Sequence, residues 1–158
     1  CRGELRRQLP QGILLAIGLN DSGRVGRPDG RYQLDPEGFL FGLQQLLQVA
    51  QALAPTFVVG LTPVDGEAMP FADLIWYDLA SVRRYETLLE EACLGAKVPF
   101  LPMLEPLLAE PDWLHCLGAD GLHLNEEGHR RVYGRVQSWQ ALLQWAGLAL
   151  RQEATTSR

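Results

Sequence analysis

The sequence predicts one α/β domain in which a parallel β-sheet lies between two layers of helices. Short, continuous apolar runs alternate with longer segments whose apolar residues recur at helical spacing, and this alternation is typical of three-layer α/β domains. The chain has 158 residues, of which 47% are hydrophobic and 21% charged, so it can bury one sizeable core. We expect the domain over residues 1–150 and a frayed polar tail over residues 151–158.

The first elements are a short helix and a strand. Residues 1–9 are expected to form the last turns of an amphipathic helix, which Pro10 ends. Residues 13–17 are all apolar and are followed by Gly18, a pattern typical of a strand covered on both faces in a parallel sheet. Residues 19–35 are polar and glycine-rich, and they are predicted to form a loop at the carboxyl end of that strand, where open α/β sheets bind ligands.

The middle of the chain repeats this alternation. A helix is predicted over residues 36–53, with Asp35 as its N-cap and a proline at its start. A second buried strand over residues 57–61 leads into a polar loop over residues 62–66. Because the strands are expected to be parallel, the two polar loops should lie at the same end of the sheet.

The last elements follow the same pattern. A long helix is predicted over residues 73–94, with its charged side chains, Glu86 among them, mostly facing outward. A short strand over residues 98–103 contains two prolines, which favour the edge of a sheet. Asn125 is a good N-cap for a final helix that should run to about Leu150.

Charge and cysteine content exclude several classes of function. The formal net charge of −5 and the pI of about 5.2 argue against a nucleic-acid or anionic-membrane partner, and no apolar run approaches the roughly 18–20 residues that span a bilayer. Cys1, Cys93 and Cys116 are odd in number and lack the spacing of a zinc or redox site. No metal or cofactor is predicted, and a reducing compartment fits best, so we expect a cytoplasmic protein.

The candidate chemistry centres on Asp120 and His123. An acid three residues before a histidine, with Gly121 to let the chain turn and a helix opening just after, can place a carboxylate against an imidazole as an oriented general base. A capping turn at the helix start is the alternative. A metal site that includes His129 is a weaker alternative, because no third ligand stands out.

Two motifs resemble signature blocks of the SGNH (GDSL-type) serine hydrolase family. They are Gly18-Leu19-Asn20-Asp21 after the first strand and Asp120-Gly121-Leu122-His123 before the last helix. The resemblance implies a flavodoxin-like α/β/α fold and a serine esterase or lipase that acts on a small-molecule ester or thioester and needs no cofactor. It also favours the catalytic pair over the capping turn.

The resemblance implies a role for each matching residue. His123 would be the base, Asp120 the acid that orients it, and Asn20 a donor to the oxyanion of the tetrahedral intermediate. The residues predicted to bind substrate are Gly18, Asp21, Ser22, Met69 and Phe71. For Met69 and Phe71, which follow the second polar loop, core packing and a place in the substrate pocket are equal alternatives.

The sequence departs from the family in lacking the Gly-Asp-Ser block that carries the nucleophile and the glycine block after the second strand. Ser22 is the only serine in the expected loop, and its position after Asn-Asp disfavours it as nucleophile. Cys93 and Cys116 are the other candidates, but buried, inert thiols are the better prediction for both.

The strand over residues 13–17 gives a physical reason to expect a missing neighbour. A strand that is apolar on both faces is not left as a bare edge in natural sheets, because it invites pairing with other chains. We therefore expect the chain to be the C-terminal portion of an SGNH hydrolase without its first βαβ portion, inactive alone and prone to self-association through residues 13–17. A non-catalytic binding or interaction module with the same fold is the alternative function.

Overall fold

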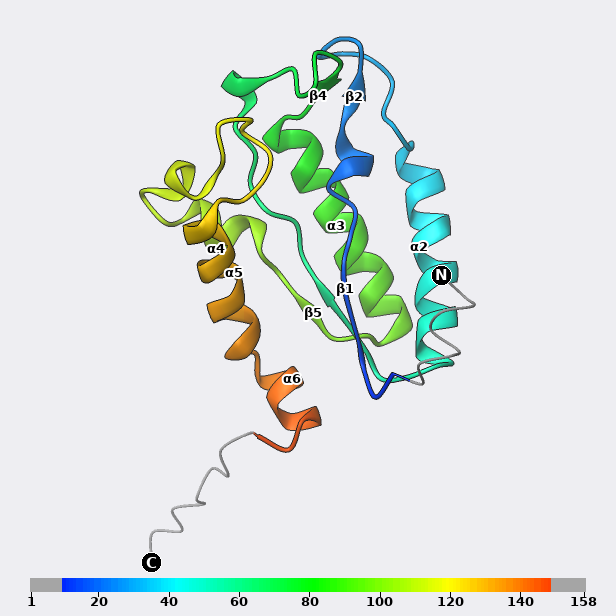
Figure 1. The fold of residues 1–158 in the computed structure, drawn as a ribbon. Coiled ribbons are helices and arrows are strands. Elements are labelled where there is room, and N and C mark those ends of the chain that lie inside the picture. The colour runs from blue at the N-terminus through cyan, green and yellow to red at the C-terminus, as the bar shows by residue number, and fades with distance from the viewer. Residues whose placement is uncertain (1–9, 149–158) are drawn as a thin grey trace, which may run out of the picture.

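The computed structural model describes residues 10–148 and confirms an α/β fold built on a parallel sheet (Figure 1). The helix predicted over residues 1–9 and the tail predicted over residues 151–158 lie outside the described residues. The strands of the sheet are β1 (Ile13–Ala16), β3 (Thr56–Val59) and β5 (Phe100–Leu101), in the order β1-β3-β5. The helices are α2 (Pro36–Gln51), α3 (Leu79–Ala96), α4 (Leu104–Leu108), α5 (Glu126–Gln137) and α6 (Gln140–Trp145).

The sheet places the carboxyl ends of its strands at one end of the molecule. β1 pairs with β3 in parallel, Ile13 opposite Thr56 and Ala16 opposite Val59, and β3 pairs in parallel with β5. A separate antiparallel pair, β2 (Arg24–Val25) with β4 (Ile75–Trp76), joins the loops that follow β1 and β3. Both polar loops predicted from the sequence therefore lie above the same end of the sheet (Figure 1).

Helices α2 and α3 cover one face of the sheet because their apolar residues recur on one side. Leu43 and Leu47 of α2 and Leu89 of α3 are buried in one core with Val58, and fully burying a side chain such as Leu47 contributes about 1.5–3 kcal/mol. The predicted N-cap of α2 is confirmed, since the Asp35 Oδ1 accepts a hydrogen bond from the Gly38 N–H at 2.9 Å.

Helices α5 and α6 lie on the opposite side (Figure 1). Alternation along β3 turns Val59 toward this layer, where it packs in a cluster with Val132 and Val136. The ring of Phe57 lies 5.6 Å from the rings of both Trp139 and Trp145, centroid to centroid. The same strand thus contributes one face to each helical layer.

The prediction of one continuous helix from Asn125 to about Leu150 is wrong within the described residues. Asn125 is the N-cap, as predicted, but α5 ends at Gln137 and α6 begins at Gln140. The Ser138 hydroxyl donates to the backbone oxygen of Gly134 at 2.9 Å, and Trp139 takes an extended conformation. The break turns Trp139 onto Phe57.

The helix predicted over residues 73–94 begins later and runs further. It spans Leu79–Ala96, and Asp78 caps it by accepting from the Ser81 N–H at 2.7 Å. Ala72 and Asp73 have positive φ angles of 49° and 58°, which exclude a helix there. Residues 75–76 instead form β4.

Strand β1 is covered on one face, not on two as predicted. Ile13 is buried against Ala50 and Ala54, but the next side chain, Leu14, is 48% exposed on the other face. Among residues 10–148 no further strand pairs with the outer edge of β1. Across the same described ranges no helix is long and apolar enough to cross a membrane.

Candidate active site

The Asp120 carboxylate holds the His123 ring. Its Oδ2 lies 2.7 Å from the Nδ1 of His123, while its Oδ1 accepts the backbone N–H groups of Leu122 at 3.0 Å and His123 at 2.9 Å. The hydrogen bond from His123, followed by the two backbone bonds, lowers the pKa of Asp120 to about 2. The carboxyl group is therefore ionised at neutral pH, and it leaves the Nε2 of the exposed imidazole available for proton transfer.

The loop that carries this pair is closed at its base by the backbone. Leu117 and Leu124 form an antiparallel bridge, and the Gly118 N–H donates to the His123 oxygen at 2.7 Å. Asn125 adds its side chain, whose Nδ2 donates to the backbone oxygens of His115 at 2.7 Å and Leu117 at 2.9 Å. The Oδ1 of the same Asn125 accepts from the Gly128 N–H and caps α5.

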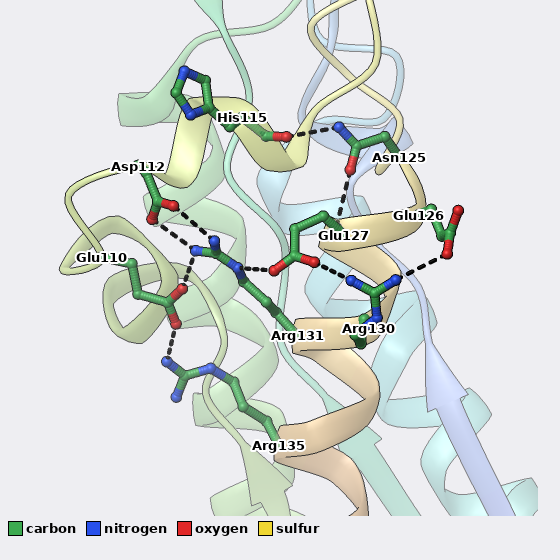
Figure 2. Close-up of polar contacts among 10 residues, drawn as sticks. Glu110, Asp112, His115, Asn125, Glu126, Glu127, Arg130, Arg131 and Arg135 are labelled. Carbon is green, nitrogen blue, oxygen red and sulfur yellow. Dashed lines mark hydrogen bonds and ion pairs between the residues drawn. The ribbon is translucent and has the colours of Figure 1, made fainter.

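A network of ion pairs ties the segment before this loop, which includes Glu110 and Asp112, to α5 (Figure 2). The Arg131 guanidinium binds Asp112 through two hydrogen bonds of 2.9 and 2.8 Å and also binds Glu110 and Glu127. Arg135 pairs with Glu110 at 2.7 Å. Hydrogen bonds to Arg131 lower the pKa of Asp112 to about 2, so the segment before the loop is tied to the helix after it.

Asn20 lies at the carboxyl end of β1, in a short 3₁₀ turn that Gly18 opens with a φ of 110°. Asn20 is exposed, and within residues 10–148 its side-chain amide has no hydrogen-bond partner. Its backbone oxygen accepts from the Gln33 side chain at 2.8 Å. The turn is thus held through its backbone, and the amide is available to a ligand.

Asn20 faces an open pocket of about 240 Å³ between the ends of β1 and β3. Its lining residues are Ala16, Ile17, Gly18, Leu19, Asn20, Gly60, Leu61 and Thr62. Most of these are small or apolar, and Asn20 and Thr62 provide the polar side chains. The pocket has the chemistry of a site for a small, largely apolar group with one polar atom to bind.

Packing links the Asn20 turn to the Asp120–His123 loop. The amide of Gln33 reaches both the Asn20 oxygen and the Tyr77 hydroxyl, the latter at 3.3 Å. The Phe71 ring lies 6.5 Å from the Tyr77 ring and 5.5 Å from the His123 ring. Both motifs therefore belong to one connected surface at the same end of the sheet.

The loop after β3 also packs against the Asp120–His123 loop. The Asp65 N–H donates to the Gly121 oxygen at 2.8 Å, and Gly121 has a φ of 65°. A Cβ at Gly121 would lie 2.5 Å from the Cβ of Ala68. Only glycine permits this approach.

The predicted substrate-binding residues do not all lie at the 240 Å³ pocket. Gly18 lines the 240 Å³ pocket. Met69 and Phe71 are both half-buried against the main core, and the Phe71 ring also lies against His123. Asp21 is half-buried and faces a neighbouring surface groove on the α2 side, and burial raises its pKa.

The prediction that Ser22 contacts substrate is wrong. Its side chain is fully buried, and its Oγ donates to the Leu19 oxygen at 2.7 Å. Among residues 10–148, no serine or cysteine hydrogen-bonds to His123. Cys93 and Cys116 are buried, and burial raises the pKa of both thiols, that of Cys93 to about 11. In the same part of the chain, no three metal-binding side chains come together.

Sequence reasoning missed Gln33 and Gly60, and it placed Thr62 in a polar loop at the ligand-binding end of the sheet without naming it as a site residue. Gln33 reaches Tyr77 from a distance of 44 residues along the chain, and no local pattern signals such a contact. The position of Gly60 and Thr62 directly after a buried strand could have identified them, since ligands bind at the carboxyl ends of parallel strands.

The comparisons with known proteins identify the family of the chain and support its fold. Residues 2–131 match the sequence model of the GDSL-like lipase/acylhydrolase family. No curated protein matches the chain. Three similar solved structures, all at identities that establish the fold alone, are a lipase/acylhydrolase from Enterococcus faecalis, a GDSL-like lipase from Parabacteroides merdae and a peptidoglycan O-acetylesterase.

The degree of similarity is alike in the three cases. The Enterococcus faecalis structure is 15% identical with a TM-score of 0.69, and the match covers 84% of this chain and 62% of that one. The Parabacteroides merdae structure is 15% identical with a TM-score of 0.63, and the match covers 93% of this chain and 68% of that one. The O-acetylesterase is 12% identical with a TM-score of 0.68, and the match covers 92% of this chain and 41% of that one. With a family match over residues 2–131, the chain belongs to the GDSL-like lipase/acylhydrolase family.

Proposed function

We propose that this chain supplies the general base, its orienting acid and one oxyanion donor of a serine ester hydrolase. The observation that carries the proposal is the Asp120 Oδ2–His123 Nδ1 contact of 2.7 Å, which leaves Nε2 on an exposed ring. The unpartnered Asn20 amide at the mouth of the 240 Å³ pocket supports it. The nucleophilic serine comes from outside residues 10–148.

The proposed chemistry is acyl transfer in two steps. The serine oxygen attacks the ester carbonyl as His123 Nε2 takes its proton, and Asp120 stabilises the imidazolium. The Asn20 amide donates to the oxyanion, a contribution that is typically worth about 10²–10³ in kcat. His123 then gives the proton to the leaving alcohol or thiol, and water, activated by the same base, releases the acid and restores the serine.

Substrate size is proposed from the pocket. A volume of about 240 Å³ lies below the roughly 300–1,000 Å³ of typical small-molecule sites, so a short acyl group fits it better than a long chain. The solved neighbour described as a peptidoglycan O-acetylesterase acts on an acetyl ester, and this supports short acyl esters as the first substrates to test.

The test is labelling and turnover. We expect the purified 158-residue chain to show no reaction with a fluorophosphonate probe and no serine-dependent turnover of p-nitrophenyl acetate. The coding region upstream of Cys1 should encode a strand with a Gly-Asp-Ser turn, and the longer protein should lose turnover on His123→Ala. Labelling of the isolated chain, or an upstream region without such a turn, would refute the proposal.

The alternative is a non-catalytic binding module with the same fold, which the missing Gly-Asp-Ser block favours. It predicts that the longer protein binds short esters through the pocket without turnover. Equilibrium binding measured beside turnover separates the two functions.

Self-association through residues 13–17 is also proposed for this chain. The outer edge of β1 is unpaired among the described residues, and the side chains of Leu14 and Ile17 are 48% and 37% exposed. Such an edge is a template for pairing with another strand.

A further inference from the structure

Glu86 is a buried acidic residue that the candidate chemistry does not use. The sequence predicts that it faces outward on the long helix, and this is wrong, because Glu86 is only 8% exposed. Its Oε1 accepts three backbone hydrogen bonds, from Leu61 at 3.2 Å, Met103 at 2.9 Å and Leu104 at 3.1 Å. A buried carboxylate is tolerated only when it is hydrogen-bonded in this way.

The three donors belong to two segments that need to be held together. Leu61 follows β3 and lines the 240 Å³ pocket between Gly60 and Thr62, whereas Met103 and Leu104 begin α4. A Cβ on Gly60 would lie 2.1 Å from the Glu86 Oε1. The carboxylate therefore packs directly beneath the wall of the candidate active-site pocket.

The other end of the carboxyl group faces away from that pocket. Glu86 lines a second open pocket of about 210 Å³ on the far side of the wall, together with Arg83, Thr87, Glu90, Phe100, Pro102 and Glu105. No hydrogen bond within residues 10–148 engages Oε2, and no buried side-chain polar atom of those residues lacks a partner. Oε2 thus reaches solvent through the outer pocket.

The charged groups around Glu86 define how it titrates. Burial raises its pKa and outweighs the opposing effect of the three backbone hydrogen bonds, and the carboxylate of Glu105 on α4 raises it further. On its own helix, Glu90 lines the same pocket, and Arg83 is paired with Glu105 at 2.6 Å. A proton can therefore bind Oε2 from solvent while Oε1 stays in contact with the wall.

We propose that Glu86 is a positioning residue for the pocket wall Gly60–Thr62, and that it transmits its own protonation state from the outer pocket to that wall. Charge-assisted hydrogen bonds are shorter and about twice as strong as neutral ones. The ionised carboxylate therefore holds Leu61 and the start of α4 more tightly than the protonated acid does. That this wall borders an ester site rests on the proposed function, whereas the coupling itself does not.

The experiment is a pH titration of backbone amide resonances in the ¹⁵N-labelled 158-residue chain. The amides of Leu61, Met103 and Leu104 should shift with one common midpoint above 4.5, the ordinary pKa of glutamate. The amides of Gly60 and Thr62 should follow the same midpoint. In Glu86→Gln this transition should disappear, and in the control Glu90→Gln it should persist.

Hydrogen exchange provides a second measurement. Glu86→Gln keeps a neutral acceptor at Oε1 and should speed exchange of the Leu61 amide only partly, whereas Glu86→Leu should speed it about tenfold, the loss of roughly one hydrogen bond. If Glu86→Leu does not fold, the Glu86→Gln titration decides alone. Separate midpoints for the three amides, or a transition that survives Glu86→Gln, overturn the proposal. Neither measurement involves an ester, so failure here is distinct from failure of the proposed hydrolase.

Discussion

Replacing Gly121 by alanine should test whether close packing at this glycine holds the Asp120–His123 loop in place. The φ of 65° at this position costs an alanine about 1–2 kcal/mol. The new Cβ would lie 2.5 Å from the Ala68 Cβ and 3.0 Å from the Asp65 oxygen, an overlap that costs about 1–3 kcal/mol more. We therefore expect Gly121→Ala to lower the free energy of unfolding by about 2–5 kcal/mol.

The assay is urea unfolding, with Gly134→Ala as the matched control. Gly134 lies inside α5 with nothing within 4 Å of an added Cβ, so its replacement should stabilise the chain by up to about 1 kcal/mol. Displacing the loop should also weaken the contact of Asp120 with His123 and raise the pKa of Asp120 from about 2 toward 3.8, which carboxyl NMR measures. Equal unfolding midpoints for the two variants, together with an unchanged Asp120 pKa, would refute this account of the loop.

Three further predictions follow from the contacts described above. The pKa of Asp120 is lowered to about 2 from 3.8, so its ionised form contributes stability that is present above pH 3.8 and lost as the pH falls through 2. Asp120→Asn should therefore lower the free energy of unfolding by about 1 kcal/mol near neutral pH, after allowance for solvent screening. Urea unfolding repeated at decreasing pH should show that this difference disappears at the acid end. Arg131→Lys should lower the urea midpoint more than the control Arg130→Lys, because Arg131 binds three carboxylates and joins α5 to the segment of Glu110 and Asp112, whereas Arg130 binds only within α5; equal losses would contradict this. Leu14→Lys should shift the sedimentation equilibrium of the chain toward monomer, and an unchanged mass distribution would exclude pairing through β1.

Much of the fold could be predicted because its signals are local. Strands of a parallel sheet are typically apolar along their length, so β1 and β3 stand out as apolar runs, although only β3 is buried on both faces among residues 10–148. The caps Asp35 and Asn125 are readable because each accepts from a backbone N–H three residues ahead. The contact of Asp120 with His123 follows from the same short spacing.

The errors occurred where distant contacts override local preference. No glycine or proline marks the break between α5 and α6, which depends on Trp139 packing against Phe57. Glu86 has the sequence context of a solvated helix face, and its partners lie 17 to 25 residues away. Ser22 follows the Gly18-Leu19-Asn20-Asp21 motif in an exposed-looking polar loop, yet the tight turn directs its hydroxyl inward.

The double use of the Asn125 side chain limits which residues evolution or a designer can place there. Serine, threonine, aspartate and asparagine all cap helices well, but of these only asparagine also carries an N–H₂ group that can donate to two carbonyls. Aspartate would keep the bond to Gly128 and place a negative charge against the oxygens of His115 and Leu117. In a saturation library selected for folding, this position should therefore tolerate asparagine alone, whereas Asp35, which only caps α2, should accept all four residues.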